Sequence, residues 1–214
     1  GAVMIPPNAR NIEASKRFYH RAIEIDPNCA LAFAGLGHAD IVSAWHHEFE
    51  PRARDKYFKS GTELALKARE IDPKIALSYV SLTVSFLLQD NAEKALEISK
   101  RGIEQCPNTP EAFMGFGLIN TALGNFVEAL ESIKKGIDLD PLHRTNYLVL
   151  INYHYAMQNY KEVIAVFERE FGDALIIDLP PYDWSIILCS YIKEEDHKAA
   201  ANLLVDLKKA YPEF

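Results

Sequence analysis

Histidine and carboxylate side chains, which zinc takes as ligands in proteins, crowd into one short stretch of the sequence, AWHHEFE. The stretch contributes His46, His47, Glu48 and Glu50, and His38 stands two turns earlier on the same expected helix. Neighbouring residues on a helix point about 100° apart, so the two adjacent histidines cannot both face one ion without a ligand from elsewhere. The His-Glu-x-x-His spacing of zinc proteases is missing. We therefore predict no metal site. One alternative hypothesis is an enzyme that uses these histidines to bind a metal ion. Tightly bound metal in the purified protein would support it.

A second set of residues has the types needed for nucleophilic chemistry. Cys189 has Asp183 and His197 within reach in the sequence, and a thiol beside an imidazole can act as an activated nucleophile. Cys189 lies in the apolar segment IILCSYI, however, where we expect an ordinary buried thiol. The chain has no Gly-x-Ser-x-Gly motif and no glycine-rich phosphate loop. These patterns predict a protein without catalysis and without a cofactor.

The elements that carry these residues are separated by a recurring phrase that ends in a proline. It reads AIEIDPN, AREIDPK and GIDLDPL, and the prolines of the series stand at positions 27, 73, 107, 141 and 212. Proline lacks a backbone N–H and pushes the preceding residue out of the α region, so each phrase should end one helix and turn the chain. The gaps between these prolines are 46, 34, 34 and 71 residues, which are 34 plus 12, 34, 34, and twice 34 plus 3. The chain is therefore built on a 34-residue period.

Aromatic and small residues keep fixed distances from these prolines. Six residues after the first four prolines, and at the equivalent place before the last, stand Phe33, Tyr79, Phe113, Tyr147 and Trp184. Twelve residues before the first four stand Ser15, Gly61, Ala95 and Ala129, and ten residues after the first and third stand Gly37 and Gly117. Small side chains let two helices approach closely, while the aromatic residue fills the space between neighbouring helix pairs.

This pattern resembles the tetratricopeptide repeat, a helix-turn-helix unit of 34 residues, over about residues 11 to 212. The resemblance implies an all-α fold, a right-handed solenoid of antiparallel helix pairs whose concave face is lined by the first helix of each pair. We predict one array over residues 1–214. It contains a partial repeat at 11–25, a repeat at 30–75 with 12 inserted residues, and further repeats at 76–109, 110–143, 144–177 and 181–214.

In this family the residues seven, eleven and fourteen after the proline face the groove. The resemblance therefore implies a largely apolar partner-binding groove formed by His38, Val80, Val84, Leu87, Met114, Leu118, Leu148, Asn152 and Tyr155. The Lys and Asn clamp with which some co-chaperone members hold a carboxylate is absent. An exposed apolar strip of this length is unusual for a monomer, so we expect a protein or peptide to cover it. Packing between successive first helices is the competing use of these side chains.

The 12 inserted residues fall between the two helices of the 30–75 repeat, in SAWHHEFEPRARDKYFKS. We expect the first helix to run to about Glu48 and the second to begin at Pro51, since proline suits the first turn of a helix. The longer helices would form a protruding hairpin whose surface carries Trp45, Phe49, Arg52, Arg54 and Tyr57. Such residues could dock a partner. They could equally supply the apolar seam that two long helices need.

Composition narrows the class of protein. The net charge of −7 argues against nucleic-acid contact, which needs clustered Lys and Arg. No apolar run is long enough to span a bilayer, so we predict no membrane contact. The three cysteines, Cys29, Cys106 and Cys189, are an odd number without Cys-x-x-Cys spacing, which favours a reducing, cytoplasmic location.

The sequence supports two functional hypotheses besides the enzyme. The first is a non-catalytic protein-interaction module that binds a partner segment in the groove. The second is a regulatory or sensory segment of a larger bacterial signalling protein or transcription regulator, which contacts its own chain or the other copy in a homodimer. The long-hairpin repeat followed by regular repeats resembles the arrays found beyond the catalytic or DNA-binding domains of bacterial adenylate cyclases and transcription regulators.

Overall fold

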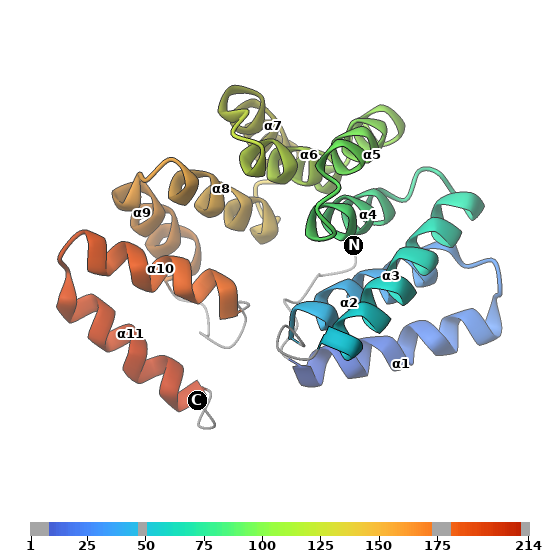
Figure 1. Ribbon diagram of the computed structural model, residues 1–214, viewed down its shortest axis with the longest axis horizontal. Coiled ribbons are helices and arrows are strands. Elements are labelled where there is room, and N and C mark those ends of the chain that lie inside the picture. Colours follow the sequence, from blue (N-terminus) through green and yellow to red (C-terminus); the bar gives the residue numbers. More distant parts are fainter. Residues whose placement is uncertain (1–8, 47–50, 173–180, 211–214) are drawn as a thin grey trace. The chain divides into compact units, whose positions relative to one another are not determined.

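The computed structural model describes residues 9–46, 51–172 and 181–210, and within these residues it contains helices and no strand. In chain order the helices are α1 (Ala9–Ile25), α2 (Ala30–His46), α3 (Pro51–Ile71), α4 (Ala76–Leu88), α5 (Ala92–Gln105), α6 (Pro110–Ala122), α7 (Phe126–Leu139), α8 (Arg144–Ala156), α9 (Tyr160–Phe171), α10 (Pro181–Lys193) and α11 (His197–Ala210). The chain divides into two compact units, one of Ala9–Leu142 and one that contains His143–Phe214. The first unit holds α1 to α7, and the second holds α8 to α11 (Figure 1).

Two kinds of turn separate the helices. After α1, α3 and α7 an aspartate precedes the proline, and its side chain accepts a hydrogen bond from the backbone two residues on. These bonds join Asp26 to Asn28 (2.9 Å), Asp72 to Lys74 (2.8 Å) and Asp140 to Leu142 (3.0 Å). The shorter turns after α4, α6, α8 and α10 each contain a residue with positive φ, namely Asp90, Gly124, Gln158 and Glu195. A left-handed residue is the common way to end a helix and reverse the chain.

The first helices of the pairs form a closer layer than the second helices. In the first unit α2 contacts α4 and α4 contacts α6, and in the second unit α8 contacts α10. Among the described residues, by contrast, no Cα atoms of successive second helices, such as α3 and α5 or α9 and α11, lie within 8 Å of each other. A layer that packs closely on one side and spreads on the other is concave on the close side, so the first helices line the concave side of each unit.

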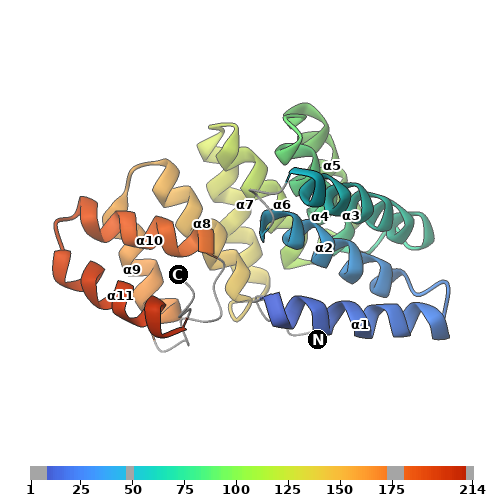
Figure 2. The same cartoon turned by 60° about the horizontal axis from the view of Figure 1, so that its bottom comes forward.

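Composition explains this layering. Helices α4 and α6 are apolar or small around most of their circumference, as ALSYVSLTVSFLL shows, whereas α5 and α7 have one apolar and one charged face. A helix that is apolar all round is stable only when neighbours cover most of it. Each first helix therefore lies between two other helices, as α2 does between α1 and α3 (Figures 1 and 2).

Small residues set the distance between α2 and α3, as the sequence predicts. A Cβ atom added to Gly37 would lie 2.9 Å from the carbonyl oxygen of Gly61, and one added to Gly61 would lie 2.8 Å from that of Gly37. The two backbones are therefore in direct contact. In the pair formed by α6 and α7, a Cβ atom added to Gly117 would lie 2.7 Å from Cγ1 of Ile133.

The all-α expectation is confirmed for the described residues. Each pair of helices begins where we expected a repeat to begin, at Ala30, Ala76, Pro110, Arg144 and Pro181, although the division into repeats remains a prediction. Helix α3 begins at Pro51, as expected, and its 21 residues exceed the 12 to 14 of the second helices that follow. The end of α2 is described only to His46.

Candidate functional site

The first unit contributes six of the expected groove residues. Val80 and Met114 are buried, with 3% and 5% of their surface exposed, and the others, His38, Val84, Leu87 and Leu118, are half-buried. Val80 faces the next first helix, because a Cβ on Gly115 of α6 would lie 3.4 Å from its Cγ2 atom. Packing between first helices therefore uses some of these side chains, and the half-buried ones keep surface for a partner.

Val84 also has an internal contact. It packs against the buried cluster of Ile41, Ala44 and Phe58, which joins α2 to the extended part of α3. The groove lining and the core beneath it are thus continuous at this point.

His38 is the polar residue of this lining. Its Nδ1 atom lies 3.3 Å from the hydroxyl oxygen of Ser81 on α4. Since the Ser81 hydroxyl donates to the carbonyl of Leu77 at 2.8 Å, Nδ1 of His38 acts as the donor to Ser81. Burial lowers the pKa of His38 to about 4, so the imidazole is neutral at physiological pH. The lining of the first unit therefore presents no charge at that pH.

The second unit contributes Leu148, Asn152 and Tyr155 from α8, all of them half-buried. The Asn152 amide nitrogen donates to the carbonyl of Leu148 at 2.8 Å and to Oδ1 of Asp183 on α10 at 3.3 Å. Both amide hydrogens are therefore used inside the protein. The amide oxygen is the atom that Asn152 can offer to a partner's backbone N–H.

Asp183 is a buried carboxyl group, with 6% of its surface exposed. Burial raises its pKa to about 7, and the hydrogen bond from Asn152 opposes this shift only in part. Asp183 therefore gains a proton more readily in the folded protein than in the unfolded chain, where its pKa is near 3.8. The stability that it contributes is fully present below pH 3.8 and is lost as the pH rises through about 7.

We expect Asp183→Asn to be more stable than the natural chain at pH 8. Asparagine keeps the acceptor for Asn152 and cannot ionise, so the advantage should shrink as the pH is lowered to 5. Thermal unfolding of both proteins at the two pH values measures the effect, with the exposed Glu162→Gln as the control in the same unit. An equal advantage at both pH values would show that ionisation of Asp183 is not its cause.

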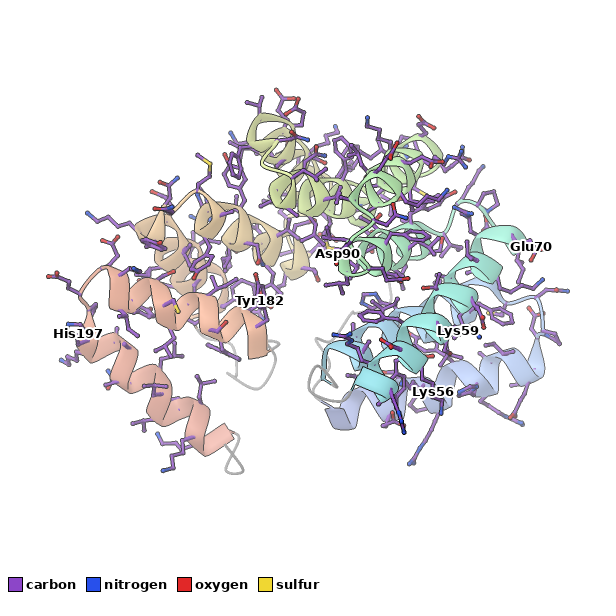
Figure 3. All side chains as sticks on the ribbon, viewed as in Figure 1. Lys56, Lys59, Glu70, Asp90, Tyr182 and His197 are labelled. Atoms are coloured by element: carbon purple, nitrogen blue, oxygen red, sulfur yellow. The ribbon has the colours of Figure 1, made fainter. Side chains whose placement is uncertain are left out.

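The expectation of a buried Cys189 is wrong. The residue is exposed, because α10 packs its Trp184 and Ile187 inward and leaves the face of Cys189 and Ile192 uncovered. Cys189 lies close enough to Tyr155 to raise the pKa of that phenol together with burial. His197 begins α11, at the opposite end of α10 from Tyr182 (Figure 3). Among the described residues, the Asp183 carboxyl group accepts a hydrogen bond from Asn152 and not from His197 or Cys189.

No protein-family model matches the chain. A chain of the APC/C hetero-tetramer Cut9–Hcn1 is similar in structure, with a TM-score of 0.65 and 13% identity over 95% of this chain and 37% of that one. The thermophilic TPR protein TTC0263 of Thermus thermophilus is similar with a TM-score of 0.62 and 15% identity over 92% of both chains. The chain has the tetratricopeptide repeat fold.

Two curated proteins are also similar to this chain in sequence. The BBSome complex member BBS4 of Bos taurus is 28% identical over 120 residues, which are 56% of this chain and 22% of that protein. The TPR repeat-containing protein YpiA of Bacillus subtilis strain 168 is 22% identical over 134 residues, or 62% of this chain and 30% of that protein. The chain thus spans less than a third of either relative. Neither relative supports the expected likeness to the arrays of adenylate cyclases.

The expected hairpin surface lies partly outside the described residues, which exclude Phe49 and the side chain of Trp45. Arg52 is exposed, and Arg54 is half-buried with its Nε atom 3.6 Å from Oδ1 of Asp55. Tyr57 is half-buried, and the ammonium group of Lys16 on α1 lies 4.4 Å from the centre of its ring. Tyr57 is therefore used in packing between helices.

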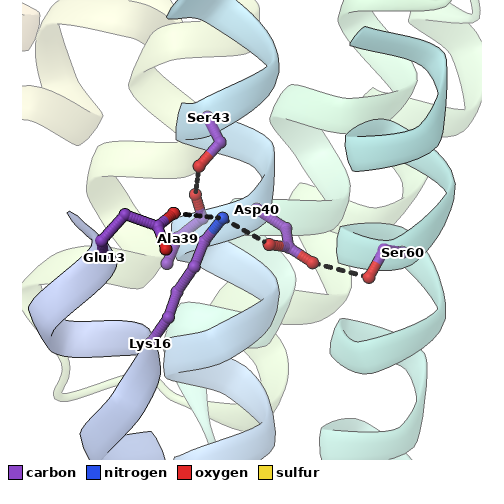
Figure 4. Close-up of polar contacts among 6 residues, drawn as sticks. All are labelled: Glu13, Lys16, Ala39, Asp40, Ser43 and Ser60. Carbon is purple, nitrogen blue, oxygen red and sulfur yellow. Dashed lines mark hydrogen bonds and ion pairs between the residues drawn. The ribbon is translucent and has the colours of Figure 1, made fainter. Parts of the chain in front are cut away.

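A buried polar cluster connects the first three helices, and the sequence alone did not predict it (Figure 4). The Lys16 ammonium group lies 2.9 Å from Oδ1 of Asp40 on α2 and 3.6 Å from Glu13. The hydroxyl of Ser60 on α3 donates to the other oxygen of Asp40 at 2.6 Å. Lys16 and Asp40 are each only 7% exposed. One sequence feature could have indicated this cluster, because Asp40 is the one carboxylate in the otherwise uncharged sequence of α2.

Exposed apolar residues near the ends of the first helices were also missed. Leu88 and Leu123 follow this pattern in the first unit, and Met157 follows it in the second, with 39% to 41% of their surface exposed. They stand in or beside the turns between the helices of a pair. These side chains add apolar surface at the C-terminal ends of α4, α6 and α8.

The part of the chain that the structure describes contains neither a cluster of metal ligands nor a helix that could span a membrane. No three His, Cys, Asp or Glu residues there gather as metal ligands do. His47, Glu48 and Glu50 and the side chain of His46 lie outside that part. None of the described helices has both the length and the apolar character needed to cross a bilayer.

Proposed function

We propose that the chain is a non-catalytic protein-interaction module that binds a segment of a partner protein on its concave side. The observation that carries this proposal is the layering of the helices. The first helices pack on one another and the second helices spread, which supports a groove on the first-helix side, where we expect the half-buried residues of α2, α4 and α6 to lie. The proposed groove residues are the ones predicted from the sequence. His38, Val80, Val84, Leu87, Met114 and Leu118 belong to the first unit, and Leu148, Asn152 and Tyr155 belong to the second.

The chemistry of the lining indicates the kind of segment that fits. In the first unit the apolar side chains that keep exposed surface are Val84, Leu87 and Leu118, and they lie beside a neutral histidine. Burial of a partner's apolar side chains would supply the affinity, at about 25 cal/mol for each Å² of apolar surface covered. In the second unit the amide oxygen of Asn152 would accept a hydrogen bond from the partner's backbone.

The names of two similar proteins agree with this class of function. One is a member of the BBSome complex, and another is a chain of a hetero-tetramer, so both are named as parts of protein assemblies. A second candidate is a regulatory segment that contacts the rest of a longer chain or a second copy.

Substitution of Leu118 tests the groove. We expect Leu118→Glu to abolish capture of a partner from a lysate of the source cells, because an ionised carboxylate opposes burial of an apolar segment. Mass spectrometry of the proteins retained by each variant gives the result. The matched control is Val127→Glu, since Val127 is 70% exposed on the second helix α7 and lies away from the first-helix layer.

Two results would contradict the proposal. One is equal capture of the same partner by Leu118→Glu and the natural chain, provided that circular dichroism shows equal helicity. The other is loss of capture by Val127→Glu alone, which would place the site on the outer layer.

A further inference from the structure

A cleft of about 380 Å³ lies in the first unit, where the C-terminal ends of α3 and α5 meet α4. It is lined by Arg69, Pro73, Tyr79, Arg101, Glu104 and Gln105. None of these residues belongs to the proposed groove. Two guanidinium groups stand against one carboxylate in this lining, although the whole chain carries a net charge of −7.

The Arg69 side chain packs against an aromatic ring, and its positive charge has no counter-ion among the described residues. Its guanidinium carbon lies 5.9 Å from the centre of the Tyr79 ring, in a cation–π contact. Its Nη1 atom is buried without a hydrogen-bond partner, and within the described residues no carboxylate forms an ion pair with it. Because Nη1 has no accessible surface, a ligand in the cleft would meet the other N–H groups of this guanidinium, which lines the cleft.

Arg101 supplies the second cation. Its Nη2 atom lies 2.9 Å from Oε1 of Glu97 one turn earlier, and its side chain is 57% exposed. A guanidinium group has five N–H donors, so this single ion pair leaves donors for a ligand. Both arginines act on the Tyr79 hydroxyl, since their charges oppose the rise that burial causes in its pKa. Arg69, Tyr79 and Arg101 line the same cleft.

We propose that this cleft binds a small oxyanion, a phosphate or a carboxylate group, between Arg69 and Arg101. Planar guanidinium groups pair with both through parallel N–H···O bonds, which makes arginine the usual residue at such sites. The Tyr79 hydroxyl and the Gln105 amide can add further donors. Glu104, together with Asp72 beside the cleft, limits the affinity and makes a loosely held ligand the expectation.

A titration of the whole chain with sodium phosphate tests the proposal. At fixed pH and ionic strength, ¹H–¹⁵N spectra should show saturable shifts of the amides of residues 69, 79, 101 and 105. A parallel titration with N-acetylaspartate distinguishes a carboxylate ligand from phosphate. Saturation by either compound supports the site, and the tighter of the two names the preferred ligand.

Substitution of each arginine tests whether the two guanidinium groups bind the anion. We expect Arg101→Gln to weaken binding at least about tenfold, as removal of a charged hydrogen-bond donor does. Arg69→Gln should do the same. Arg101 is exposed, so its variant stays informative even if Arg69→Gln disturbs the packing on Tyr79. Arg21→Gln is the matched control, because Arg21 is also exposed and paired with a nearby glutamate at 2.8 Å. Absence of saturable shifts, or equal binding by Arg101→Gln, would overturn the proposal.

Discussion

Replacement of Lys16 by methionine is expected to lower the free energy of unfolding by about 3 to 5 kcal/mol, which would be the largest effect of any single substitution considered. Methionine fills most of the space of the lysine but leaves the Asp40 carboxylate buried with only the Ser60 hydroxyl as partner. A buried charge without its counter-ion costs far more than the ion pair contributes. Urea unfolding of Lys16→Met, followed by circular dichroism, measures the loss.

The double variant Lys16→Met, Asp40→Leu separates this cause from a loss of packing. Because the uncompensated charge is gone, the double variant should recover most of the stability lost by Lys16→Met alone. Lys67→Gln removes an exposed ion pair with Glu70 and should cost less than about 1 kcal/mol. If the double variant were as unstable as Lys16→Met, the loss would come from packing of the lysine side chain instead.

The fold was largely predictable because its signals are local and repeated. Proline ends helices for steric reasons that do not depend on the rest of the chain, so the phrases around Pro27, Pro73 and Pro141 give the turns directly. The aromatic and small residues recur at the same distances from these prolines, which locates the helix pairs. The start of α3 at Pro51 follows from the same local rule.

The polar contacts were less predictable because they depend on which helix faces meet. Asp40 stands out in an uncharged helix, but its partner on α1 is decided by the rotation of that helix against α2. Likewise Asp183 looked like part of a catalytic set with Cys189, and only the packing of α8 on α10 shows that its partner is Asn152. The exposure of Cys189 has the same origin, since IILCSYI is apolar on both faces and α10 is covered on one.

A methyl group added at the contact between α2 and α3 tests the close approach that the small residues allow. We expect Gly37→Ala to lower the free energy of unfolding by about 2 to 3 kcal/mol, because the added Cβ would lie 2.9 Å from a backbone oxygen that cannot rotate away. Gly61→Ala should have a similar effect, with its Cβ 2.8 Å from the oxygen of Gly37. The helices would have to separate.

The matched control is Gly115→Ala, where the new Cβ would lie 3.4 Å from Val80 Cγ2, at an ordinary contact distance from a side chain. Alanine favours the helix by about 1 kcal/mol over glycine, so this variant should be as stable as the natural chain or slightly more stable. Helix propensity favours alanine at all three positions. A loss at Gly37 and Gly61 but not at Gly115 would therefore isolate the backbone contact as the cause. Equal stability of all three variants would mean that α2 and α3 can move apart at little cost, and that close approach is not what the small residues of this pair are selected for.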